Sequence, residues 1–146
     1  MKKIGFVIVL VIGVLVMATS FTYDNFVAPN EMPPAAQLFI QNHFPDSKVT
    51  LVEKDINFLS KEYTICLSDG TKIDFDTNGD WEEVDCRFSA VPIEVIPEPI
   101  AAYVTVNFND FPVVEIIKTR RTYKVELANG IDLRFSKYGH LLDSDD

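Results

Sequence analysis

The sequence contains few of the residues on which enzymatic catalysis usually depends. Its 146 residues include two histidines, His43 and His140, and two cysteines. Neither histidine lies in a metal-binding spacing or beside a convincing nucleophile. G-x-S-x-G, H-E-x-x-H and C-x-x-C motifs and glycine-rich phosphate loops do not occur. We therefore expect a protein that is not an enzyme and that holds no metal ion or cofactor.

Basic residues are also scarce. Thirteen lysines and arginines stand against 22 acidic residues, which gives a net charge of −9. An acidic protein repels the phosphates of nucleic acids and the headgroups of anionic lipids. We expect neither nucleic acid nor a membrane surface as a partner of the mature chain. A basic partner is compatible with this charge, and so is a simple requirement for solubility.

The N-terminus has the features of a secretory signal peptide. Lys2 and Lys3 precede the apolar run Ile4–Ala18, and small residues follow at a plausible cleavage point after Ser20. The run is shorter than the roughly 20 residues that span a bilayer, which favours cleavage over a retained anchor. We expect an exported protein, periplasmic or extracellular, in which residues 21–32 form a loose N-terminal arm.

The remaining chain contains an internal repeat. Four residues recur 60 positions later (123 − 63): Tyr63 and Tyr123, Gly70 and Gly130, Phe75 and Phe135, Gly79 and Gly139. A repeat at a fixed spacing indicates that one structural unit occurs twice in the chain, and it therefore determines the expected fold. We therefore expect two tandem repeats, 33–91 and 92–146.

Each repeat begins with a predicted helix. Prolines, which are tolerated in the first turn of a helix, open both segments at Pro33-Pro34 and at Pro97-Glu98-Pro99. Apolar residues then follow at the helical spacing i, i+3, i+4 and i+8. They are Ala36, Phe39, Ile40 and Phe44 in the first helix, and Ile100, Tyr103, Val104 and Phe108 in the second.

The helices are followed by predicted antiparallel strands. Alternating apolar residues share one face only if Tyr63 pairs with Phe75 and Tyr123 with Phe135, which leaves the three-residue loops 68–70 and 128–130. Further turns at Gly79 and Gly139 lead into last strands. The predicted fold class is α+β, with each repeat a helix packed on a four-stranded antiparallel meander.

One face of the predicted sheet is polar and provides the candidate binding residues. With the two hairpin tips they are Asp69, Lys72, Asp74, Lys124, Glu126, Asn129, Asp132 and Arg134. Trp81 has the parity of the opposite, apolar face, so we expect it in the core. A polar face without catalytic residues favours a non-enzymatic module that binds a protein or peptide.

An alternative function is a calcium-dependent structural or adhesive module. The run Asp74–Asp85 matches the start of a calcium-binding loop, D-x-[DN]-x-[DN]-G. Position 12 is the short Asp85 rather than glutamate, and Ile73 and Phe75 predict an entering strand instead of a helix. The second repeat keeps the glycine turn without the acidic residues, so a plain β-turn is the favoured interpretation.

The sequence does not decide whether Cys66 and Cys86 form a disulfide. An exported protein meets an oxidising compartment, which favours a disulfide. The expected register places Cys66 opposite Lys72, and Lys72 opposite Val84, so the cysteines would lie two strands apart, roughly 10 Å. A bulge in the strand that begins at Trp81 would allow the bond.

The pattern as a whole resembles a known family. It consists of a helix ending in Phe44-Pro45, then Tyr-x-[IV]-x-Leu-x-[DN]-Gly-x-x-[IL]-x-Phe-x-x-x-Gly, then Trp-x-x-Val-Asp-Cys and Val-Pro, and then the Tyr-to-Gly block again. It is similar to the PepSY-like, β-lactamase-inhibitor-like proteins secreted by Bacteroidetes-type bacteria. The resemblance covers the chain from about Pro33 to Leu142.

The resemblance implies the fold of the β-lactamase inhibitor protein, in which two helix-plus-meander units join their sheets into one concave surface. The namesake binds an enzyme through that surface and its hairpin loops, and PepSY domains are associated with restraint of secreted peptidases. By position, Asp69 resembles the acidic tip of the inhibitory hairpin. The implied function is binding, and with it inhibition, of a secreted or periplasmic enzyme such as a peptidase.

Overall fold

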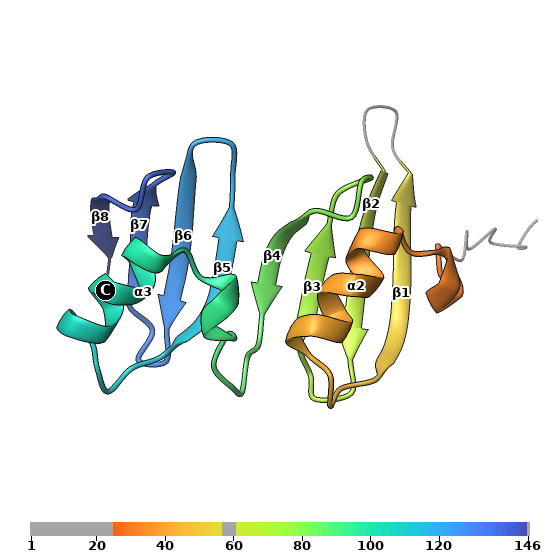
Figure 1. Cartoon of the computed structure of the whole chain (residues 1–146), viewed down its shortest axis with the longest axis horizontal. Helices are drawn as coiled ribbons and strands as arrows, with labels where there is room; N and C mark the ends of the chain where they lie inside the picture. Colours follow the sequence, from red (N-terminus) through yellow and green to blue (C-terminus); the bar gives the residue numbers. More distant parts are fainter. Residues whose placement is uncertain (1–24, 57–60, 146) are drawn as a thin grey trace, which may run out of the picture.

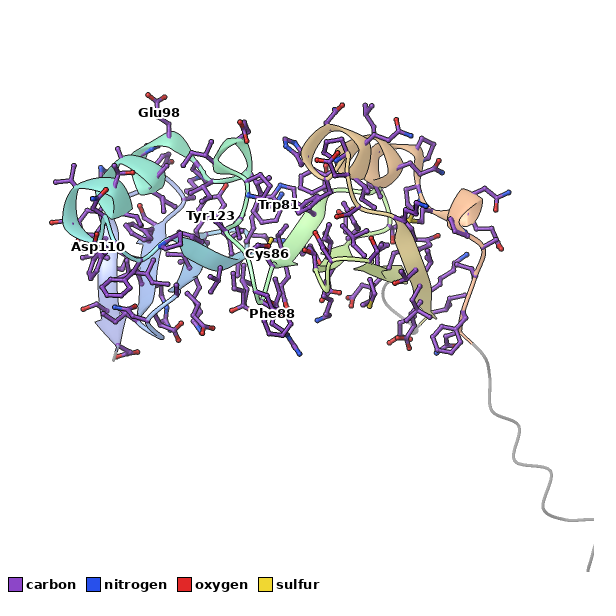
Figure 2. All side chains as sticks on the ribbon, turned by 90° about the horizontal axis from the view of Figure 1, so that it is seen from below. Trp81, Cys86, Phe88, Glu98, Asp110 and Tyr123 are labelled. Atoms are coloured by element: carbon purple, nitrogen blue, oxygen red, sulfur yellow. The ribbon has the colours of Figure 1, made fainter. Side chains whose placement is uncertain are left out.

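The computed structural model describes residues 25–56 and 61–145 and shows one antiparallel sheet with helices on one of its faces (Figures 1 and 2). The eight strands lie in sequence order, each pairing with the next. The elements are η1 (Pro29–Glu31), α2 (Pro34–His43), β1 (Val49–Ile56), β2 (Lys61–Leu67), β3 (Lys72–Phe75), β4 (Trp81–Asp85), η2 (Ile93–Val95), α3 (Glu98–Asn107), β5 (Val113–Lys118), β6 (Thr122–Leu127), β7 (Asp132–Ser136) and β8 (Leu141–Asp145).

Two expectations concern the beginning of the chain. The signal peptide, its cleavage after Ser20 and the first residues of the arm lie outside the described residues. Within the described ranges, the structure contains no helix long and apolar enough to cross a membrane.

Both predicted helices form and bury the predicted faces. α2 buries Ala36 and Ile40 against the sheet, and α3 buries Ile100 and Val104. Each helix begins after a proline and ends before a phenylalanine whose N–H donates to the carbonyl four residues back. The sheet contributes apolar side chains to the same core, so that all of them belong to one cluster.

The predicted hairpin registers are confirmed. Tyr63 pairs with Phe75 in the β2–β3 hairpin, and Tyr123 pairs with Phe135 in the β6–β7 hairpin. Gly70 closes the first loop with φ +90°, and its N–H donates to the Leu67 carbonyl at 3.1 Å. The register followed from side-chain parity because a shift of one residue would have turned every apolar side chain away from the helices.

The predicted register between β3 and β4 was wrong by one residue. Lys72 lies opposite Asp85 rather than Val84, because Glu82 is an extra residue on β4 between the pairs Phe75–Trp81 and Asp74–Glu83. Such a bulge shifts all later pairs along the strand. The same irregularity occurs 60 positions later, between β7 and β8.

The structure contains no disulfide between Cys66 and Cys86, and both cysteines are free thiols. The bulge shifts Cys86, the residue after β4, by one position relative to β3, but it does not bring the two side chains together. Cys66 alternates with the buried Ile65 and Leu67, so it lies on the helix-free side of β2. Cys86 is 1% exposed, and its burial raises the pKa of the thiol to about 11. Two buried or half-buried thiols on different sides of a sheet fail the geometry that a disulfide needs.

The pairing of β4 with β5 joins two halves of similar construction, α2 with β1–β4 and α3 with β5–β8. The pairs across this join are Glu83 with Ile117, Val84 with Ile116, and Asp85 with Glu115. Val84 and Ile116 are both fully buried. The join therefore continues the hydrophobic core from one half to the other.

The N-terminal arm, expected to be loose, is partly ordered against the sheet. Phe26 forms an isolated antiparallel bridge with Glu53 of β1. The Val27 N–H donates to the Val52 carbonyl at 3.0 Å, and the Lys54 N–H donates to the Asn25 carbonyl at 2.7 Å. Residues 25–27 thus cover the edge of β1, which would otherwise be the first free edge of the sheet.

Two equivalent glycines fix the helices on the sheet, and this contact can be tested. A Cβ at Gly79 would lie 2.7 Å from the Ala36 backbone nitrogen in α2, and a Cβ at Gly139 would lie 2.5 Å from Pro99 Cβ in α3. Gly130 has the same φ of +87° as Gly79, but nothing lies within 4 Å of its Cβ position. Gly130→Ala is thus a matched control for backbone strain alone.

We expect Gly130→Ala to reduce the free energy of unfolding by about 1 kcal/mol, the cost of a left-handed alanine. Gly79→Ala should cost about 3 kcal/mol, because the methyl group also collides with the helix backbone. Urea denaturation of both variants measures the difference. Equal losses would show that the approach of α2 to the hairpin does not constrain the fold.

Candidate binding surface

The side of the sheet opposite the helices is lined by polar side chains from every strand, and we call it the polar face. Figure 2 shows both helices on one side of the sheet and this face on the other. Its position follows from strand alternation and register. The residues that line it include Glu53, Thr64, Cys66, Lys72, Asp74, Glu83, Asp85, Glu115, Lys124, Glu126, Asp132, Arg134, Asp143 and Asp145. The apolar Leu51 and Ile117 lie on this face as well.

In the first half, a lysine is fixed between two carboxylates of the polar face. Lys72 Nζ lies 3.2 Å from Asp74 Oδ2 and 3.4 Å from Glu83 Oε1. The Thr64 hydroxyl donates to the other oxygen of Asp74 at 2.7 Å. Burial alone would lower the pKa of Lys72, but the two carboxylates outweigh it and raise the pKa. The cluster is held in place before any partner arrives.

The second half has an ion pair on the same face, between one lysine and one carboxylate. Lys124 Nζ lies 2.7 Å from Asp132 Oδ2, and this hydrogen bond is the main reason why the pKa of Lys124 is raised. The other oxygen, Asp132 Oδ1, is buried and has no hydrogen-bond partner among the described residues. A pocket of about 280 Å³ lies beside it, lined by Lys124, Asp132, Leu133, Arg134, Asp143 and Asp145.

Carboxylates gather where the halves join. Glu115 of β5 lies opposite Asp85 on one side and Glu126 on the other. Burial raises the pKa of the Glu115 carboxyl, and the carboxylates of Glu83, Asp85 and Glu126 raise it further. Lys124 only partly offsets this effect. The centre of the polar face is therefore a region in which negative charge is only partly compensated.

The two predicted hairpin tips are exposed, but their polar groups hold the turns. Asp69 accepts a hydrogen bond from the Ser47 hydroxyl at 2.7 Å and another from the Thr71 N–H at 2.9 Å. Partial burial would raise the pKa of Asp69, but these hydrogen bonds outweigh it and lower the pKa. Asn129 likewise accepts from the Ile131 N–H at 3.2 Å. Both side chains stabilise their loops, which limits what they can offer a partner.

An exposed aromatic residue beside the first tip was not predicted from the sequence. Phe88, in the loop after β4, is 83% exposed. Its ring lies 3.5 Å from the Cβ position of Gly70, and Figure 2 shows it projecting on the side of the polar face, near the join. The preceding Arg87 has φ +48°, and its N–H donates to Asp85 Oδ1 at 2.8 Å. The sequence contains one indication of this residue: Phe88 is an aromatic residue that lies outside the alternating apolar patterns of the predicted strands.

Trp81 lies on the helix side, as predicted, but it is only half-buried. Its ring packs near Phe39, with centroids 6.4 Å apart, and Lys118 Nζ lies 4.5 Å from its centroid. Lys118 belongs to β5, so this cation–π contact also crosses the join. A groove of about 570 Å³ opens beside it, lined by Trp81, Ile93, Glu94, Val95, Ile96, Pro97, Glu98, Ala101, Lys118 and Tyr123.

The acidic run Asp74–Asp85 comprises the end of β3, a turn at residues 77–79 and the whole of β4, and its side chains do not fit a calcium loop. Asp76 Oδ1 accepts the N–H groups of Asn78 and Asp80, at 2.8 and 2.9 Å. Asp74 is directed to the polar face, where the Lys72 ammonium would repel a cation. The equivalent turn of the second half uses the Ser136 hydroxyl oxygen in the role of Asp76. Throughout the described residues, no three acidic, histidine or cysteine side chains form a metal-binding group.

The geometry defines an α+β module with one helix-covered and one polar sheet face, and comparison with known proteins places it in a family. The profile of the family described as "Putative beta-lactamase-inhibitor-like, PepSY-like" matches residues 61–143. The chain belongs to this PepSY-like, β-lactamase-inhibitor-like family, which confirms the resemblance noted in the sequence. No curated protein sequence matches the chain.

Three solved structures from Bacteroides share the fold of this chain. One, from Bacteroides thetaiotaomicron, is described as a "putative calcium-regulated periplasmic protein"; it is 40% identical, with a TM-score of 0.81, over 84% of this chain and 96% of that one. A protein from Bacteroides vulgatus, described as a "putative periplasmic protein", is 35% identical (TM-score 0.81, 86% and 99% covered). A second from the same organism, of unknown function, is 32% identical (TM-score 0.77, 80% and 94% covered). These descriptions confirm the expected export.

The crowding of carboxylates at Glu115 leads to a pH-dependent prediction. Because the folded-state pKa of Glu115 is raised above its ordinary value of 4.5, the folded protein retains a proton that the unfolded chain releases. Its contribution to stability therefore falls as the pH rises from about 4.5 through the folded-state pKa. Glu115→Gln removes the charge at nearly constant size.

We expect Glu115→Gln to be more stable than the wild type at pH 7 and equally stable near pH 4, as measured by urea denaturation across this range. Glu94→Gln, an exposed change remote from the polar face, is the control and should show no such pH-dependent gain. A Glu115→Gln variant that is less stable than the wild type at pH 7 would contradict the placement of Glu115 among like charges.

Proposed function

We propose that the chain is an exported, non-enzymatic module that binds a protein or peptide through its polar face. The observation that carries this proposal is the face itself, which extends over all eight strands and is not covered by a helix. Exposed side chains with a fixed arrangement cost less conformational entropy when a partner binds. The ion pairs of Lys72 and Lys124 provide that arrangement.

Phe88 gives the proposed surface an apolar anchor. Residues that dominate binding energy are commonly aromatic or arginine side chains surrounded by polar groups. Phe88 and Arg87 lie together at the margin of the polar face, and the carboxylate of Asp85 fixes the loop that presents them. A phenylalanine left 83% exposed in the free protein would gain substantially from burial in a partner.

The inhibition of a secreted or periplasmic enzyme, such as a peptidase, is the form of binding that the family resemblance favours. In this proposal residues 33–91 and 92–146 are two copies of one unit, exported by a signal peptide over residues 1–20, and their joined sheet forms a concave surface. The regular elements of the two copies then serve as scaffold. The residues that differ between them, including Asp69 and Asn129, would account for partner choice.

The proposal is tested by affinity capture from periplasmic and secreted extracts, with quantitative mass spectrometry. The test variant changes three cations of the polar face, Lys72→Glu, Lys124→Glu and Arg134→Glu. The matched control changes three cations in turns away from that face: Arg120→Glu, Arg121→Glu and Lys137→Glu. We expect at least one protein that the wild type and the control variant both capture. The amount of this protein captured by the test variant should be at least tenfold lower.

Thermal unfolding of both variants comes first, to establish that they are folded. A captured set that is unchanged by the polar-face substitutions, or lost equally with the control, would count against the polar face as the binding surface.

A calcium-dependent structural or adhesive module is the second candidate, favoured by the description of the 40% identical relative as calcium-regulated. The use of Asp76 and Asp74 in other interactions argues against the predicted loop. We therefore expect 5 mM calcium chloride to change the melting temperature by less than 1 °C, with magnesium chloride as the ionic control. A calcium-specific increase of several degrees would favour this second function.

A further inference from the structure

The outer edge of β8 has the geometry of a place where a further strand would pair. β8 follows the register of β4 at a distance of 60 positions. Asp85 pairs with Lys72, and Asp145 with Asp132; Glu83 pairs with Asp74, and Asp143 with Arg134. In the first half, β5 occupies the other edge of β4. Among the described residues, nothing pairs with the corresponding edge of β8.

The two ends of the sheet differ in this respect. Residues 25–27 cover the edge of β1 with backbone hydrogen bonds, whereas all five residues of β8 are exposed. Free edges of natural sheets are often short, or guarded by charged side chains, especially lysine, or by proline. β8 has no lysine or proline, and its charged residues are the two aspartates, Asp143 and Asp145. Three exposed apolar side chains lie at or next to it: Tyr138 at 68%, Leu141 at 40% and Leu142 at 56% exposure.

The charges beside this edge indicate which strand it would accept. Asp143 and Asp145 lie on the polar face of β8, and Asp132 lies one strand further in. The unpartnered Asp132 Oδ1 lines the same 280 Å³ pocket as both of them. A lysine or arginine on an adjacent strand, about 4.8 Å from β8, would face Asp145 directly and reach towards this pocket.

A second copy of the chain fits this edge less well. By the register of β4 on β5, the β1 strand of another copy would place Glu53 opposite Asp143, and like charges directly opposite are unfavourable. The N-terminal residues 25–27 would also have to leave β1. Both features favour a different occupant.

We propose that the edge of β8 binds an extended, antiparallel segment of a cationic partner. The segment carries lysine or arginine opposite Asp143 and Asp145, with an apolar residue between them opposite Ser144. This inference rests on the proposed protein- or peptide-binding function and adds a second contact, through backbone hydrogen bonds, beside the polar face.

The test uses the exported protein labelled with ¹⁵N and a capped peptide, Thr-Val-Lys-Val-Lys-Val-Thr, followed by amide shifts in NMR spectra. We expect saturable shifts that are largest at residues 141–145, and none with the glutamate analogue of the peptide. Two further versions of the lysine peptide carry N-methyl groups on alternate amides, one version along one edge of the extended peptide and the other along the opposite edge. Because N-methylation removes the N–H donors, the version methylated on the edge that faces β8 should not bind.

Variants separate strand pairing from general attraction to an acidic protein. Asp143→Lys with Asp145→Lys should weaken binding of the lysine peptide at least tenfold and permit binding of the glutamate peptide. Glu94→Lys with Glu98→Lys makes the same change of net charge on the helix side and should alter the affinity less than twofold. The spectra themselves report whether each variant is folded.

Three results would overturn the proposal: equal weakening by the two variants, unimpaired binding of both methylated peptides, or β8 shifts that depend on protein concentration alone. The last would identify a second copy as the occupant. Absence of β8 shifts together with polar-face-dependent capture would reject the edge and leave the proposed function intact. Peptide binding at β8 without polar-face-dependent capture would support the edge and count against the polar face as the binding surface.

Discussion

The pairing of β4 with β5 is the contact on which the rest of the structure depends. Each half contains one helix and four strands, about 60 residues, which is marginal for a stable core on its own. Val84 and Ile116 meet across the join and are fully buried. The contact of Lys118 with the Trp81 ring crosses the same boundary. The core of each half therefore continues into the other through these two strands.

This join also determines which surfaces are left for binding. Both helices pack on the same side of the continuous sheet, so the opposite side becomes one polar face rather than two separate ones (Figure 2). The join brings Asp85 and Glu115 together at its centre. It also leaves β1 and β8 as the two ends of the sheet (Figure 1). The polar face and the free edge thus follow from a single strand pairing.

Much of the fold could be predicted from the sequence because apolar parity and three-residue loops leave few choices of register. Tyr63 opposite Phe75 follows from those two facts alone, and the helices follow from proline and spacing. The bulge at Glu82 could not be predicted, since Glu82 and Glu83 are both polar and either could face outward. The ordering of residues 25–27 depends on backbone hydrogen bonds to β1, which leave no pattern of side chains.

The candidate site was predicted in part. Parity correctly assigned Lys72, Asp74, Lys124 and Asp132 to one face, but it could not show that they form ion pairs with one another. Asp69 is an exposed tip, as predicted, but parity could not show that its carboxylate accepts hydrogen bonds from Ser47 and Thr71. Phe88 was missed because loop side chains have no periodicity from which their exposure could be inferred. Residues in strands were therefore easier to place than residues in turns.

The claim that the polar face is the binding surface is tested most directly by mapping a captured partner onto the ¹⁵N-labelled protein. If the polar face binds the partner, amide shifts and slowed hydrogen exchange will concentrate in β1–β8 and at Phe88, with little change in α2 and α3. Changes centred on the helices, or on the groove beside Trp81, would contradict it.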